Sequence, residues 1–255
     1  MEQPLSAETI IQRLENLADE EQSLRVQRYF KTDRGDYGEG DIFLGVKLPE
    51  QRRLSGEARL LPLDQIEKLI RSPYHEVRAC GFQIYASQFK RLTSQIQRGK
   101  KPAHEATRLL QFYLKHANRC NNWDLVDTTC PHTLGQWLML AKVPDSRKWK
   151  VLDQLAHSPN LWRKRISMVS TLTALKGGRA DFTLHYAEVH LHHPHDLMHK
   201  AVGWMLREMG KHCGEDLLRA FLDNHYHTMP RTALRYAIEK LPETERQYWL
   251  KRKLQ

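Results

Sequence analysis

The chain has 255 residues, and its 40 Lys and Arg against 30 Asp and Glu leave a formal charge of +10 at pH 7. An excess of this size favours an anionic partner: nucleic acid, an acidic membrane surface or an acidic protein. No apolar run approaches the ~20 residues of a membrane-spanning helix, and the start lacks the pattern of a signal peptide. These features exclude a membrane-spanning protein and lead us to expect a cytoplasmic protein. We also expect a monomer.

The cysteines also indicate a cytoplasmic protein. The chain has four cysteines, Cys80, Cys120, Cys130 and Cys213, and none of them shows CxxC spacing. Scattered single cysteines of this kind are typical of reduced, structural thiols in a reducing compartment.

Helical periodicity runs through most of the chain, and strand-like alternation is nearly absent. Ser6 is placed as an N-cap, and Ile10, Ile11 and Leu14 follow it on one helical face. Further helices are expected at 64–71, 73–89, 103–118, 131–142, 160–175, 195–210, 214–224, 230–240 and 242–254. The sequence therefore predicts an all-α protein.

Prolines mark a repeat in this pattern. Pro73, Pro159, Pro194 and Pro230 each open an expected helix, and the last three lie 35 and 36 residues apart. A two-helix unit of this length is typical of HEAT-like repeats. We predict one domain over residues 1–255, a right-handed solenoid of about six helix pairs with a basic concave face. Residues 1–60 would hold the N-terminal helices and a glycine- and acid-rich loop, and 61–255 the repeat array.

A basic residue stands five or six positions after each of these prolines: Arg78, Arg165, Lys200 and Arg235. Equivalent positions in stacked repeats line one surface, so these cations are expected to form a basic stripe that meets phosphates. The alternative is an ordinary solvated face, since helices are often rich in Lys and Arg.

The segment NNWDLVDTTC, residues 121–130, places Trp123 and Asp127 one helical turn apart on a shared face. Asp124 lies about 100° around the helix and is expected to cap or pair locally. A ring face attracts positive charge, and a carboxylate stabilises positive charge that develops in a transition state. The alternative is a packed core tryptophan with a helix-capping aspartate.

Two later segments carry similar residue types. SPNLWRKRISMV places Trp162 and Arg165 three apart within a basic run, which indicates either a phosphate site or a solvated face. In HKAVGWMLREMGK, Lys200 and Trp204 share a face, and Gly203 allows a close approach by a ligand or by another helix.

Two other segments carry weaker signals. The loop at 32–41 is rich in glycine and acid but lacks the lysine of a phosphate loop, so we expect a structured connection. The histidines at 185–199 have some metal-ligand spacings, among them His195 and His199, but no HExxH motif or cysteine ligand accompanies them. We expect no metal and no cofactor, and solvent-facing or backbone-bonded histidines.

The chain resembles the AlkD-like DNA alkylation repair family, HEAT-repeat DNA glycosylases, in five segments that occur in the family order. These are RYFK, FLGVKLPEQRRL, WDLVD, LWRKR and KAVGWMLRE. Asn122 stands where the family often has a second tryptophan. The resemblance implies a helical solenoid that wraps alkylated double-stranded DNA in a basic channel, and removal of cationic N3- and N7-alkylpurines without turning the base into a pocket.

The resemblance also implies residue roles. Asp127 would be the catalytic aspartate, Trp123 and Trp204 the active-site tryptophans, Arg165 the phosphate contact, and Tyr29 a residue near the lesion. Two other functions are weighed against this one. The first is a non-catalytic HEAT-repeat protein that binds branched or distorted DNA, and the second is a helical scaffold for an acidic protein.

Overall fold

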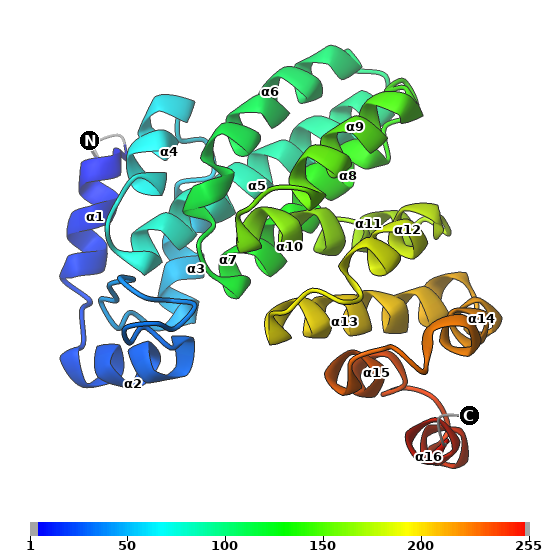
Figure 1. The fold of residues 1–255 in the computed structure, drawn as a ribbon. Coiled ribbons are helices and arrows are strands. Elements are labelled where there is room, and N and C mark those ends of the chain that lie inside the picture. The colour runs from blue at the N-terminus through cyan, green and yellow to red at the C-terminus, as the bar shows by residue number, and fades with distance from the viewer. Residues whose placement is uncertain (1–4, 253–255) are drawn as a thin grey trace. The chain divides into compact units, whose positions relative to one another are not determined.

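The computed structural model describes residues 5–252, and over that range its regular structure is helical (Figure 1). The one pairing of the β type there is an isolated bridge between Ile42 and Tyr74. The all-α prediction is confirmed. Contacts divide the chain into two compact units, 1–133 and 134–255.

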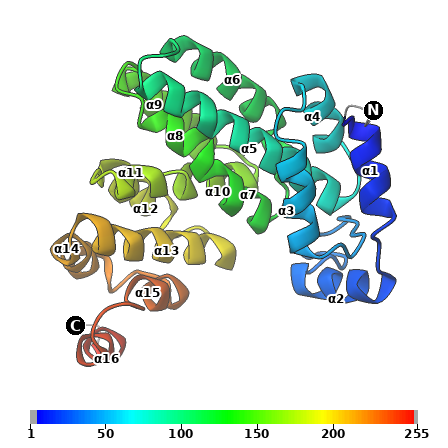
Figure 2. The same ribbon diagram turned by 180° about the vertical axis from the view of Figure 1, so that it is seen from behind.

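The first unit is built around one long helix, α5. Its helices are α1 (Ala7–Glu15), α2 (Glu20–Phe30), α3 (Leu48–Glu57), α4 (Leu63–Ile70), α5 (His75–Gln97), α6 (Ala103–His116) and α7 (Trp123–Thr129), with the 3-10 turns η1 (Ala117–Arg119) and η2 (Cys130–His132). Helix α5 packs against α1, α3, α4, α6 and α7. The reverse view shows α5 running beside α3 and α6 (Figure 2). Phe82, Tyr85 and Phe89 of α5 are fully buried, so this helix supplies much of the apolar core.

The second unit is arranged around α13. It comprises α8 (Leu134–Leu138), α9 (Asp145–Ala156), α10 (Leu161–Val169), α11 (Leu172–Lys176), α12 (Asp181–His190), α13 (Asp196–Cys213), α14 (Glu215–His225), α15 (Arg231–Ala237) and α16 (Glu243–Lys251). Helix α13 packs against α10, α11, α12, α14 and α15. A Cβ on Gly203 would lie 2.3 Å from the carbonyl oxygen of Ala233, so this glycine lets α13 and α15 approach closely.

The proline pattern located helix starts well. Helices α5, α10, α13 and α15 each begin within two residues after Pro73, Pro159, Pro194 and Pro230. Proline fixes an extended entry and donates no N–H, so it suits the residues just before a helix or in its first turn.

The expected helix boundaries were wrong in three places, one of them the end of α5, which was expected at residue 89 and lies at Gln97. The helix expected at 160–175 is two helices, α10 and α11, because hydroxyls at the junction bond to backbone carbonyls, as Thr171 does to Met168 over 2.8 Å. The helix expected at 131–142 shrinks to α8, since Pro131 lies in a 3-10 turn instead. Helices α3, α9 and α12 were not anticipated.

Within each unit, helices pack against neighbours in the chain, a pattern consistent with helical repeats. A single right-handed solenoid with a basic concave face stays a prediction, as does the single domain. No helix within residues 5–252 is long and apolar enough to cross a membrane.

The cysteines are free, as expected for structural thiols. Burial raises the pKa of Cys80 to about 11 and that of Cys120 to about 12, so both stay protonated and unreactive near neutral pH.

Candidate active site

Helix α7 brings the expected tryptophan against the end of α2. Asn122 caps the helix, its Oδ1 accepting the N–H of Trp123 over 2.8 Å. The ring of Trp123 stacks on Phe30 with centroids 5.2 Å apart and meets Tyr29 edge-on at 5.9 Å. Asp127 lies one turn further along α7 and is half-buried. The structure therefore brings Tyr29 and Trp123 together, which their spacing of more than 90 residues did not show.

A cavity of about 830 Å³ opens beside these rings. Helices α2, α3, α5 and α7 border it, and Tyr29, Trp123 and Asp124 are among its lining residues. The Tyr29 side chain is 66% exposed, an unusually large fraction for an aromatic ring that packs on two other rings. An aromatic side chain at the mouth of a cavity is available for stacking on, or packing against, a ligand.

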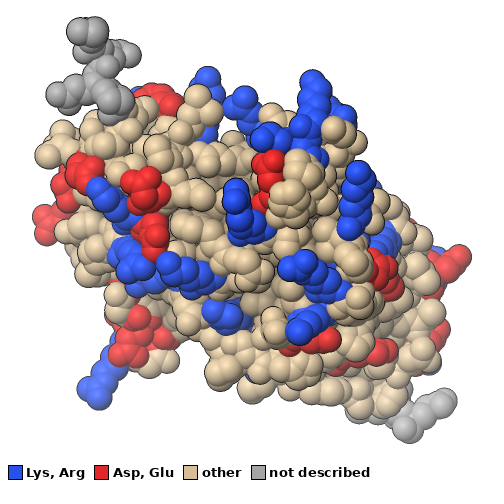
Figure 3. Space-filling model, turned by 90° about the horizontal axis from the view of Figure 1, so that it is seen from above, with Lys and Arg blue, Asp and Glu red and all other residues tan. Residues whose placement is uncertain are grey.

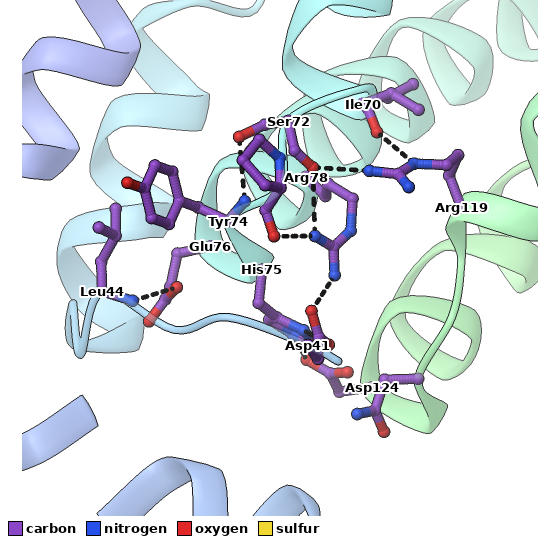
Figure 4. A network of polar contacts seen from close by, with 12 residues as sticks. Asp41, Leu44, Ile70, Ser72, Tyr74, His75, Glu76, Arg78, Arg119 and Asp124 are labelled. Carbon is purple, nitrogen blue, oxygen red and sulfur yellow. Dashed lines mark hydrogen bonds and ion pairs between the residues drawn. The ribbon is translucent and has the colours of Figure 1, made fainter. Parts of the chain in front are cut away.

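A chain of ion pairs joins Asp124, His75, Asp41 and Arg78 (Figure 4). Asp124 accepts from Nε2 of His75 over 2.9 Å, and Asp41 accepts from Nδ1 of the same ring over 2.7 Å. The other oxygen of Asp41 accepts from the guanidinium of Arg78. Asp124 therefore pairs as expected, but with a histidine 49 residues earlier in the chain rather than locally.

Charge is balanced in this chain of contacts. Burial acts to lower the pKa of His75, but the carboxylates of Asp124 and Asp41 outweigh it and raise the pKa to about 9. Burial acts to raise the pKa of Asp41, and the hydrogen bond from His75 with the charges of His75 and Arg78 lowers it overall. The cations His75 and Arg78 are thus paired with the carboxylates Asp41 and Asp124. An isolated charge at this buried position would lose the free energy of its hydration.

The glycine- and acid-rich loop supplies Asp41 and is firmly attached, as expected for a structured connection. Glu76 of α5 accepts from the backbone N–H of Leu44 and of Gly45 over 2.9 and 2.8 Å. A Cβ on Gly38 would lie 2.5 Å from the carbonyl oxygen of Phe30 and 3.4 Å from the amide nitrogen of Asn122. The loop therefore packs directly on the end of α2 and on the cap of α7.

The other expected site residues lie in the second unit. Trp204 is half-buried on α13. Lys200 of the same helix is half-buried and pairs with Asp196 at 2.9 Å, and Arg235 of α15 is exposed. Arg165 of α10 is 4% exposed, and its guanidinium donates to the carbonyl of Leu197 in the first turn of α13. A phosphate contact by Arg165 stays a prediction.

The basic stripe was wrong for Arg78. This side chain is 2% exposed and donates to the carbonyls of Ser72 and Pro73 as well as to Asp41. Arg78 lies in the first turns of α5, so its side chain can reach back to the carbonyls that precede the helix. These bonds, with the pair to Asp41, keep the side chain away from the surface. Other basic side chains do stand on the surface, with acidic ones near many of them, as Figure 3 shows for one face.

The histidine-rich segment is used for backbone bonds, as expected. His195 caps α13 by accepting the N–H of Leu197 over 3.1 Å, and His199 bonds to the carbonyl of His193 over 2.6 Å. Within residues 5–252, no group of three or more His, Cys, Asp or Glu side chains is placed to hold a metal ion.

His75 and Asp41 were missed by the reasoning from sequence. Asp41 ends a loop that was expected only as a structured connection, and His75 lies outside the histidine-rich segment. The one available signal was the Ser72-Pro73 helix start, which places His75 in the first turn of α5.

The family of the chain follows from comparison with known proteins. A family model described as "DNA alkylation repair enzyme" matches residues 10–241. The chain belongs to this family. A role in the repair of DNA alkylation damage follows from that membership, and the resemblance carried by the five segments is confirmed.

Among solved structures, this member of the DNA alkylation repair family is similar to a "Predicted DNA alkylation repair enzyme from Enterococcus faecalis". The TM-score is 0.64 at 17% identity, over 89% of this chain and 97% of that one, a likeness of fold. No curated protein matches the chain.

Proposed function

We propose that this protein is a monofunctional DNA glycosylase that removes cationic N3- and N7-alkylpurines from duplex DNA in base excision repair. The observation that supports it most is the placement of Trp123 against Tyr29 at a cavity, with Asp127 one helical turn along, in a chain of the DNA alkylation repair family. The family's repair role supplies the substrate class, and these residues supply groups suited to the reaction.

The chemistry needs few groups. An N3- or N7-alkylated purine already carries a positive charge, so when its bond to C1′ breaks it leaves as a neutral base and needs no proton from the enzyme. Positive charge then develops on the deoxyribose, and water adds at C1′ and releases its proton to solvent, which leaves a neutral abasic sugar. The carboxylate of Asp127 is suited to stabilise that charge and to orient the water.

The aromatic and basic residues are assigned to holding DNA. The face of Trp123 would pack on the sugar of the lesion and attract its growing charge, and Trp204 stays an active-site tryptophan by family resemblance. Lys200 and Arg235 reach the surface, so we assign them to phosphates, and we keep Arg165 as the phosphate contact that the family resemblance implies. We assign Tyr29, with its large exposed ring, to the neighbourhood of the lesion.

One incubation tests the proposal. Purified protein is mixed with duplex DNA that holds N7-methylguanine, and free base is measured against the same duplex without protein. We expect release of the alkylated base and none of uracil, because the proposed mechanism includes no acid to protonate a neutral leaving group. Binding of the duplex without release would favour the non-catalytic DNA-binding alternative.

A further inference from the structure

The short helix α7 carries two of the proposed active-site residues on only seven residues. A helix of this length has little stability of its own, so its orientation depends on the groups that hold it. Asn122 caps its first N–H, and the carboxylate of Asp124 is bonded to His75 over 2.9 Å. The side chain of Asp124 is 25% exposed and lines the cavity next to Trp123.

His75 connects this first turn to the rest of the unit in two ways. Through hydrogen bonds it joins Asp124 to Asp41 of the loop. Through ring contacts it stacks on Phe43 at 4.4 Å, while Phe30 lies between the imidazole and Trp123, at 5.3 and 5.2 Å. His75 borders the cavity but is only 3% exposed among these rings, so almost none of its surface is open to a DNA strand.

The hydrogen bonds from His75 to both carboxylates depend on the protonation of its ring. Both ring nitrogens face a carboxylate, and only an imidazolium has an N–H for each of them. The charged groups around the ring are Asp41 from the loop, Asp124 from α7 and, beyond Asp41, Arg78 of α5 and Arg119 of η1. Loss of the proton leaves one carboxylate without its donor, and the more exposed Asp124 is the one that can turn towards water.

We propose that His75, supported by Asp41, is a positioning residue for base excision: it holds Asp124 and thereby fixes the first turn of α7, with Trp123 and Asp127 in their working places. The proposal rests on the function proposed above and adds a residue that never touches substrate. Displacing a catalytic group by about 1 Å can lower a rate by about a hundredfold.

The test is single-turnover excision at saturating protein, so that DNA binding does not limit the rate. The substrate is a duplex with an N3-alkylated adenine, a base with no ring N–H that ionises near pH 9, and uncatalysed loss is subtracted. We expect His75→Gln to lower the rate about tenfold to a hundredfold with little change in duplex affinity. His104→Gln, a change of the same kind at an exposed position on α6, is the matched control.

The pH profile separates positioning from simple support of the fold. In the wild type the rate should fall as pH rises through about 9, the pKa of His75. Asp124→Asn keeps an acceptor but removes a carboxylate that raises this pKa, so the fall should begin at lower pH. In His75→Gln the fall should vanish. A wild-type rate and an unchanged profile in His75→Gln would overturn the proposal, as would a loss of rate that only follows the melting temperature.

A wild type that releases no base would refute the proposed function and leave the positioning of α7 to be judged directly. Amide hydrogen exchange at residues 123–129 would then be compared between the wild type and His75→Gln. Faster exchange in α7 with unchanged exchange in α6 supports the role of His75 in fixing this helix. Equal exchange in α7 contradicts it.

Discussion

His75 should make the stability of the first unit depend on pH. Its pKa is about 9 in the folded protein, against 6.5 for an ordinary histidine. Since the folded pKa is the higher one, the contribution is fully present below pH 6.5 and is lost as pH rises through about 9. At 1.36 kcal/mol per pH unit, the difference corresponds to about 3 kcal/mol.

Thermal unfolding at a series of pH values would measure this loss. For a unit of this size, about 3 kcal/mol corresponds to a fall in melting temperature on the order of 10 °C between pH 6.5 and 9.5. Lysines and tyrosines also titrate in this range, so the quantity to compare is the difference between the wild type and His75→Gln. Parallel curves for the two proteins would refute the assignment of a protonated His75 between two carboxylates.

Three further outcomes are expected. Asp127→Asn should lower the excision rate by about a hundredfold or more with an unchanged melting temperature. The control Asp64→Asn, at an exposed position, should leave the excision rate intact. A loss of excision that tracks unfolding would mean that Asp127 is structural. Lys200→Ala should flatten the dependence of log affinity on log salt by about one unit in a duplex-binding titration, and an unchanged slope would remove Lys200 from the phosphate contacts. Gly203→Ala should destabilise the second unit by about 1–3 kcal/mol in thermal melting, because its Cβ would lie 2.3 Å from the backbone of Ala233, and an unaffected melt would contradict that packing.

Much of the fold was predictable from local signals. Helical periodicity needs only the order of apolar and polar residues, and a proline sets its own φ angle, so the starts near Pro73 and Pro230 could be read without tertiary information. The spacing of Trp123 and Asp127 was equally local, since residues four apart on a helix share a face whatever surrounds the helix. The family, too, followed from short segments in a fixed order.

Burial and partnership of charges were decided only by the tertiary structure. Arg78 looks like any surface cation in the sequence, yet it is buried because Asp41 comes from a loop 37 residues earlier to neutralise it. His75 likewise pairs with Asp124, which lies 49 residues later in the chain, because the fold brings the two side chains together. Whether a charge is solvated or paired depends on which distant groups the packing brings within a few ångströms, and local sequence spacing carries no information about that distance.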